Sequence, residues 1–114
     1  MFALLMGLKT VTPAGLHELM QGKQPVTVVD VNSRQSWLKA RVPGAINLDP
    51  AACDERNLPA QRDALLAFYC SNPLCRKAPN AARRAKQMGY SNVRVMSAGI
   101  SGWLNANLPT ESGE

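Results

Sequence analysis

Short runs of apolar residues recur along the chain in the manner of strands that are buried on both faces of a sheet. Four such strands are predicted, over residues 26–30, 45–48, 65–70 and 93–96. The third run is the most apolar of the four, and it stops at a cysteine, Cys70. Because ligands of open α/β sheets bind at the carboxyl ends of the strands, this run predicts a cysteine at a ligand-binding edge.

The segments between these runs have the residue spacing of helices. Thr12 and Pro13 predict the start of a helix that ends near Gln21, and a second helix is predicted between Pro79 and Gly89. Shorter helical segments are predicted after Ser33, over residues 59–64, and over residues 99–106 with Trp103 and Leu104 facing inward. Strands that alternate with helices at short spacing indicate an α/β fold with a mainly parallel sheet.

Length and composition limit the architecture. The 114 residues fit one compact domain, and a hydrophobic share of 46% is enough for a core. Residues 1–8 are apolar but lack a basic leader and are too short to cross a bilayer, so we expect them against the core or at an oligomer contact. We expect residues 110–114 to form a flexible tail. Three cysteines are too few for a disulfide scaffold, so we expect a reducing, cytoplasmic setting. We also expect no membrane partner.

Basic residues outnumber acidic ones by thirteen to eight, which gives a formal charge of +5. Part of this excess lies in one acid-free stretch, which contains Arg76, Lys77, Arg83, Arg84 and Lys86. Such a cluster is typical of a solvated helix face, and it also favours small anions or acidic proteins as partners. Nucleic acid is less favoured, because aromatic residues that could stack on bases do not alternate with the basic ones.

Cys70 carries the strongest chemical signal in the sequence. Backbone N–H groups of the loop that follows it, and the positive end of the next helix, would favour a thiolate over a thiol. Arg76 and Lys77 would act in the same direction. The alternative interpretation is a small buried cysteine without chemistry. Cys53, in a polar loop over residues 50–59, has no recognisable partner in the sequence, and we interpret it as incidental.

Five blocks of the sequence resemble those of the rhodanese-like domain family, in the same order and over nearly the whole chain. They are Val28-Val29-Asp30-Val31, Arg41-Val42-Pro43-Gly44-Ala45-Ile46-Asn47-Leu48, Phe68-Tyr69-Cys70, Gly89-Tyr90-Ser91-Asn92-Val93, and Gly99-Ile100-Ser101-Gly102-Trp103 followed by Asn107-Leu108-Pro109. The resemblance implies a rhodanese-like α/β fold, with helices on both faces of the sheet and Cys70 as a nucleophile that carries sulfur.

The resemblance also implies a reaction and a set of site residues. The Cys70 thiolate would attack the outer sulfur of an anionic donor such as thiosulfate and form a persulfide, and a thiol, cyanide or a protein would accept the sulfur. No metal or organic cofactor is required. By their position after the nucleophile, the residues implied to bind the substrate are Ser71, Asn72, Leu74, Cys75, Arg76 and Lys77.

The loop after Cys70 departs from the family pattern, which leaves other functions open. It is longer than usual, it lacks a glycine, and Pro73 and Pro79 stiffen it. Cys70 to Arg76 has the Cys-x5-Arg spacing of phosphatases and arsenate reductases, whose arginine binds a tetrahedral oxyanion. A non-catalytic binding module of the same fold is a third possibility. Cys75 is either an inert loop residue or a partner that forms a disulfide with Cys70.

Overall fold

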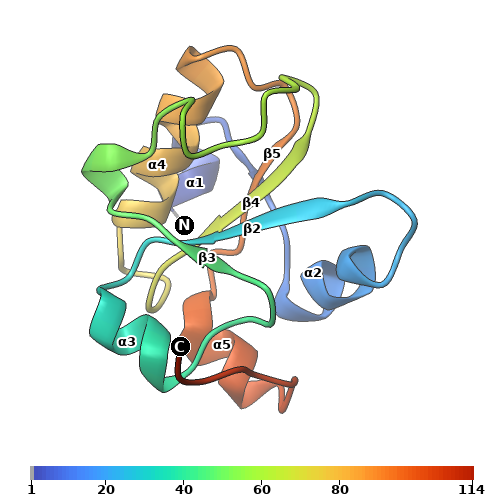
Figure 1. The fold of residues 1–114 in the computed structure, drawn as a ribbon, viewed down its shortest axis with the longest axis vertical. Helices are drawn as coiled ribbons and strands as arrows, with labels where there is room; N and C mark the ends of the chain where they lie inside the picture. The colour runs from blue at the N-terminus through green and yellow to red at the C-terminus, as the bar shows by residue number, and fades with distance from the viewer. Residues whose placement is uncertain (1) are drawn as a thin grey trace.

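A parallel sheet with helices on both of its faces forms the described part of the chain (Figure 1). The computed structural model describes residues 2–114, apart from the side chain of Leu5, so Met1 of the predicted N-terminal segment lies outside it. The strands are β1 (Lys9–Thr10), β2 (Val26–Asp30), β3 (Ile46–Asn47), β4 (Leu65–Tyr69) and β5 (Val93–Val95). They pair in parallel in the order β1-β5-β4-β2-β3, which confirms the predicted α/β fold.

The helices divide into groups that cover opposite faces of the sheet. They are α1 (Phe2–Leu5), α2 (Pro13–Met20), α3 (Arg34–Lys39), α4 (Lys77–Gln87) and α5 (Gly99–Asn105), and a short 3-10 helix, η1 (Pro50–Ala52), follows β3. Helices α1 and α4 pack on one face, and α2 and α5 pack on the other (Figure 1). Within residues 2–114, no helix combines the length and the apolar character that crossing a bilayer demands.

Strand β4 lies at the centre of the sheet and contributes to both halves of the core. All of its residues are buried, because β5 and β2 flank it and helices cover both faces. Side chains alternate along a strand, so Leu66 and Phe68 face α1 and α4, and Cys70 continues this series. Ala67 and Tyr69 face α2 and α5 on the other side. The alternation therefore directs the Cys70 thiol toward the face that α1 and α4 cover.

Helix α4 begins earlier than predicted. It starts at Lys77, whereas we predicted a start after Pro79. Proline is tolerated in the first turn of a helix, because the N–H groups there have no partner within the helix. The predicted apolar stripe is confirmed, since Ala81, Ala82 and Ala85 are buried. The earlier start brings the first N–H groups of α4 next to the loop that follows Cys70.

Other parts of the chain also differ from the predictions. The helical turn predicted over residues 59–64 consists of non-helical turns and bends, and the strand predicted over residues 45–48 pairs only at Ile46–Asn47. Trp103 is buried as predicted, but Leu104 is 47% exposed, because α5 presents only one side to the sheet. The apolar pattern does not predict α1 and β1, since elements this short cannot display a period.

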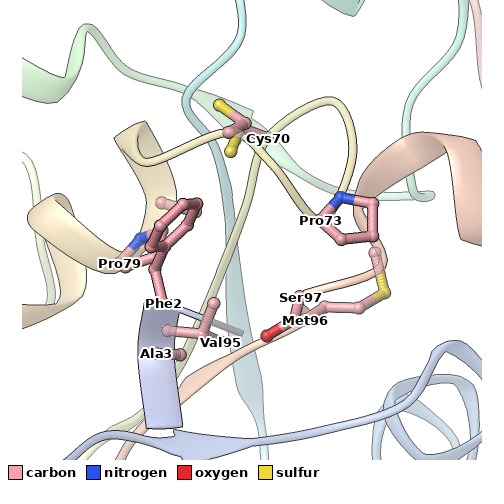
Figure 2. A pocket seen from close by; sticks show the side chains of 10 residues that line it. Phe2, Ala3, Cys70, Pro73, Pro79, Val95, Met96 and Ser97 are labelled. Atoms are coloured by element: carbon pink, nitrogen blue, oxygen red, sulfur yellow. The ribbon is translucent and has the colours of Figure 1, made fainter. Parts of the chain in front are cut away.

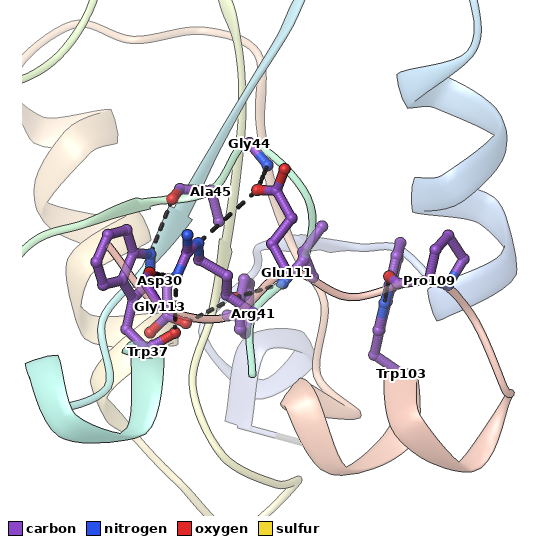
Figure 3. Close-up of polar contacts among 11 residues, drawn as sticks. Asp30, Trp37, Arg41, Gly44, Ala45, Trp103, Pro109, Glu111 and Gly113 are labelled. Atoms are coloured by element: carbon purple, nitrogen blue, oxygen red, sulfur yellow. Dashed lines mark hydrogen bonds and ion pairs between the residues drawn. The ribbon is translucent and has the colours of Figure 1, made fainter. Parts of the chain in front are cut away.

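Residues 110–114, for which we expected a flexible tail, are bonded to the segment after α3 (Figure 3). Arg41 and Glu111 exchange two backbone hydrogen bonds of 3.0 Å. The Arg41 guanidinium donates to the Gly113 carbonyl at 2.7 Å and lies 4.0 Å from the centre of the Trp37 ring. The structure therefore differs from the expectation, because hydrogen bonds hold the end of the chain against the fold.

Candidate active site

The loop after β4 brings two cysteine thiols together. Cys70 is only 3% exposed, and the chain beyond it turns back through a hydrogen bond from the Cys75 N–H to the Asn72 carbonyl, at 3.1 Å. The Asn72 side chain stabilises this turn by accepting a hydrogen bond from the Leu74 N–H at 2.9 Å. As a result, Cys75 is half-buried and its thiol lies within reach of that of Cys70 for hydrogen bonding.

The first turn of α5 holds the loop in this position. The N–H groups of Ile100 and Ser101 donate to the carbonyls of Cys70 and Ser71 at 2.9 and 3.0 Å. Gly99 has a φ of +68°, and a Cβ at this position would lie 2.5 Å from the carbonyl carbon of Ser71. Only glycine fits both the conformation and the close approach. Gly99 is therefore a positioning residue, and we assigned it no role from the sequence.

Burial and hydrogen bonding separate the two thiols electrostatically. Burial, together with the hydrogen bond to Cys75, raises the pKa of Cys70 to about 12. Partial burial raises the pKa of Cys75, but hydrogen bonds from the Cys70 thiol, the Lys77 N–H and Ser71 outweigh it and lower this pKa below its usual value. Of the two thiols, Cys75 therefore ionises more readily. The expectation of a thiolate on Cys70 stays a prediction, and burial of the Cys70 thiol opposes the effect of the amides around it.

Both cysteines face a small cavity between the loop, α1 and the end of β5 (Figure 2). Its volume is about 10 Å³, which is room for one water-sized group. It is lined by Phe2, Ala3, Cys70, Pro73, Cys75, Ala78, Pro79, Val95, Met96 and Ser97. The Ser97 Oγ is buried and has no hydrogen-bond partner within residues 2–114. A free hydroxyl in an otherwise apolar cavity is available to a group that enters it.

The residues implied to bind the substrate differ in their positions. Of these, Cys75 lines the cavity, whereas Leu74 is 71% exposed at the surface and Asn72 stabilises the turn. The Arg76 guanidinium lies 4.5 Å from the centre of the Phe2 ring, and Arg76 lines a neighbouring groove instead of the cavity.

The other two predicted binding residues, Ser71 and Lys77, act at the rim of the site. Ser71 is hydrogen-bonded to the Cys75 sulfur through its backbone and its side chain. The backbone N–H of Lys77 donates to the same sulfur. The Lys77 side chain belongs to a separate groove of about 470 Å³, which residues following β2 and β3 also line. The structure therefore brings Ser71 and the Lys77 backbone to Cys75 and directs the Lys77 side chain elsewhere.

Sequence reasoning missed the part of the cavity that lies far from the loop in the chain. Phe2 and Ala3 come from α1, and Ala3 and Leu8 are buried in the same core cluster as Cys70. This agrees with the expectation that residues 1–8 lie against the core, but no motif connects them with the cysteine. Met96 and Ser97 follow β5, which pairs directly with β4. Met96 and Ser97 could be placed beside Cys70 only once the order of the strands in the sheet was known.

Asp30, at the end of β2, is a buried acid that pairs with Tyr69, the residue before Cys70, and bonds to it on the opposite face of the sheet from Cys70. Its carboxylate accepts hydrogen bonds from the Tyr69 hydroxyl at 2.6 Å and from the Asn32 N–H at 2.8 Å. Burial raises the pKa of Asp30 despite these bonds. Asp49 caps η1 by accepting from the Ala51 N–H at 2.8 Å. Neither acid lines the cavity.

The fold is a parallel α/β sheet with a cysteine-containing loop at its carboxyl edge. The model of the Rhodanese-like domain family matches residues 12–106, and the chain belongs to this family. It is 33% identical over 88 residues to an HTH-type transcriptional regulator of Mycobacterium tuberculosis. This alignment covers 77% of the chain but only 38% of the relative's length. The chain is also 27% identical over 107 residues to the thiosulfate sulfurtransferase GlpE of Haemophilus influenzae, which covers 94% of this chain and 98% of the relative.

A solved structure shares this architecture. The thiosulfate sulfurtransferase from Pseudomonas aeruginosa superposes with a TM-score of 0.78 at 25% identity, over 93% of this chain and 20% of that protein. The family resemblance that the sequence blocks indicated is therefore confirmed. The likeness extends to thiosulfate sulfurtransferases at the level of the family.

Proposed function

We propose that the chain is a sulfurtransferase that moves the outer sulfur of a small anionic donor, such as thiosulfate, to an acceptor by way of a persulfide on Cys70. The observation that carries the proposal is the cavity beside the Cys70 thiol, whose volume of about 10 Å³ suits a single additional atom. The Ser97 hydroxyl and the loop N–H groups would stabilise the negative charge on that atom. Family membership supports the same chemistry.

In the first step, the hydrogen bond between the thiols supplies the proton transfer. Cys75 accepts the proton of Cys70 while the Cys70 sulfur attacks the outer sulfur of thiosulfate. The bond between the two sulfur atoms of thiosulfate breaks, and its electron pair leaves with sulfite. The products are a Cys70 persulfide anion, a Cys75 thiol and sulfite, so the charge balances. Cyanide then removes the outer sulfur as thiocyanate, and Cys70 recovers its proton from Cys75.

The test measures thiocyanate and sulfite from reduced protein incubated with thiosulfate and cyanide. We expect the wild type and Cys53→Ala to form both products and Cys70→Ser to form neither. Cys53 is a suitable control, because it is a buried cysteine outside the cavity and burial raises its pKa to about 11. Thiocyanate formation by Cys70→Ser at the wild-type rate would contradict the proposal.

The alternative phosphatase or arsenate reductase chemistry has less support. Such an enzyme needs an arginine on the oxyanion and benefits from an acid for the leaving group. The Arg76 guanidinium instead stacks on Phe2, and neither Asp30 nor Asp49 lines the cavity. Release of phosphate from an aryl phosphate by the wild type, but not by Cys70→Ser, would favour this alternative.

We further propose a cytoplasmic protein whose acceptor is cyanide, a thiol or a protein. The three cysteines are unpaired, as is typical of a reducing compartment. The exposed basic residues of α4 would meet an acidic protein acceptor. If this face is used, sulfur transfer to a protein acceptor would weaken with increasing salt, whereas transfer to cyanide would change less.

A further inference from the structure

Cys75 lines the same small cavity as Cys70, so any group bound to the Cys70 sulfur lies beside Cys75. The Cys75 sulfur lies within reach of the Cys70 sulfur for hydrogen bonding, and Ser71 and the Lys77 N–H bond to it as well. Both thiols are free and face the same cavity. The turn that Asn72 stabilises holds Cys75 there. A cysteine in this position is the nearest nucleophile to any sulfur that Cys70 carries.

Resting on the proposed function, we propose that Cys75 is an internal acceptor that converts the Cys70 persulfide into a Cys70–Cys75 disulfide and releases hydrosulfide. The proton that Cys75 received from Cys70 passes to the outer sulfur. The Cys75 thiolate then attacks the inner sulfur, which belongs to Cys70. The new bond joins the two cysteine sulfurs, and the bond to the outer sulfur breaks and leaves with HS⁻.

The proposed reaction reduces the transferred sulfur and oxidises the two cysteines. The sulfur that arrived in the neutral, sulfane state leaves as sulfide and has gained two electrons. The two cysteine sulfurs have lost these electrons and form the disulfide. A dithiol reductant then reduces the disulfide and returns both thiols by thiol–disulfide exchange. The net reaction consumes thiosulfate and a dithiol and produces sulfite, hydrosulfide and the oxidised dithiol.

Two observations favour attack on the inner sulfur over transfer of the outer sulfur to Cys75. Cys75 and Cys70 line the same cavity of about 10 Å³, so the sulfur of Cys70 itself, the inner sulfur, is adjacent to Cys75. Attack by the Cys75 thiolate on the outer sulfur would expel Cys70 as a thiolate that Cys75 no longer has a proton to neutralise, unlike in transfer to cyanide. Burial raises the pKa of Cys70, which makes this unprotonated thiolate a poor leaving group. Hydrosulfide is a weaker base than such a buried thiolate and leaves more readily.

The cover over the cavity gives Cys75 an advantage over external acceptors. Phe2 and Ala3 of α1 close one side of the cavity, and Pro73 and Pro79 close others (Figure 2). A bulky thiol must displace these groups before it reaches the persulfide, whereas Cys75 is already in contact. Reaction between groups held together in this way avoids the entropic cost of an encounter.

The test follows single turnovers of the reduced wild type, Cys75→Ser and the matched control Cys53→Ala by intact mass and by assays for sulfite and sulfide. One arm uses thiosulfate as the donor, and a second uses glutathione persulfide. We expect the wild type and Cys53→Ala to lose two hydrogen atoms and to release one sulfide per chain. Cys75→Ser lacks the group that accepts the Cys70 proton, so we expect it to gain one sulfur more slowly than the wild type, to retain that sulfur and to release no sulfide. Dithiothreitol should restore the reduced mass of the wild type.

The two arms separate this inference from the proposed function. Sulfite release in the thiosulfate arm decides whether the chain uses that donor, whatever follows. A wild type that retains the added sulfur as fully as Cys75→Ser overturns the inference and leaves the sulfurtransferase proposal intact. Absence of sulfide and of the disulfide from the wild type in both arms overturns it as well. A persulfide that peptide mapping places on Cys75 would show transfer of the outer sulfur instead, which also contradicts the inference.

Discussion

Strands β2 and β4 are neighbours in the sheet and end side by side, at Asp30 and Cys70, but only one of these ends has a group available for chemistry. Asp30 pairs with Tyr69 in the register of the two strands. Its carboxylate is bonded to the Tyr69 hydroxyl and the Asn32 N–H, and the same hydroxyl accepts a hydrogen bond from the Val42 N–H at 3.1 Å. This network lies on the face of α2 and α5.

At Cys70, one residue further along β4, the side chain turns to the opposite face of the sheet. There the hydrogen bonds are incomplete, because the two thiols bond mainly to each other and to loop amides, while the Ser97 Oγ has no partner in the described part of the chain. A cavity remains beside them. The comparison teaches that a polar group at the carboxyl edge stabilises the fold where its bonds are complete and performs chemistry where they are not.

The largest effect that separates the two strand ends is expected from Cys70→Ser. Thiocyanate formation should fall to the background level, because the hydroxyl of serine is a far poorer sulfur nucleophile at this site. The free energy of unfolding in urea should change by only about 1 kcal/mol, since serine preserves the shape of cysteine and can use the loop amides. Loss of stability much larger than this would show that Cys70 is a structural residue like Asp30.

Tyr69→Phe should have the opposite profile. The substitution removes the hydroxyl that joins Asp30 to the Val42 N–H. It leaves the Val42 N–H without this partner and the buried Asp30 carboxylate with only the Asn32 N–H. We expect a loss of about 1–3 kcal/mol in the free energy of unfolding, measured by urea titration. Thiocyanate formation per folded molecule should remain close to that of the wild type. A selective loss of activity would contradict the separation of the two faces.

The pH dependence of alkylation should distinguish the cysteines. Because the pKa of Cys75 is lowered, its thiolate persists as the pH falls below the usual thiol range, so iodoacetamide should modify Cys75 first. Cys70 and Cys53, with pKa values raised to about 12 and about 11, should react only at much higher pH. Peptide mapping at a series of pH values measures this order. Preferential modification of Cys70 at neutral pH would place the thiolate on Cys70 instead.

The smallest effect is expected from Phe2→Ala. The substitution removes one wall of the cavity and the ring on which Arg76 stacks, at a cost of about 0.5–1 kcal/mol for the exposed cation–π contact. Alkylation of the cysteine pair should become faster at constant pH, because the reagent reaches the cavity more easily. The substitution Leu4→Ala serves as a control, since Leu4 lies in the same helix but is 68% exposed. Equal acceleration by both substitutions would indicate unfolding of α1 instead of local access.

The sequence by itself determined the α/β fold, the central buried strand and the position of Cys70 at its end. Apolar runs predict buried strands because burial of contiguous apolar side chains is a property of neighbouring residues. The family blocks added the nucleophile. The start of α4 at Lys77 was missed, because a proline in the first turn permits two boundaries that local pattern does not distinguish.

Only the tertiary structure decided which residues surround Cys70. Phe2 and Ser97 are remote from it in the chain and reach the cavity through the packing of α1 and the pairing of β5 with β4. The difference between the pKa values of the two thiols was equally hidden, because a pKa depends on burial and on hydrogen bonds that form only when the loop turns back. The sequence shows which cysteines are present, but burial and contacts between distant segments set their relative pKa values.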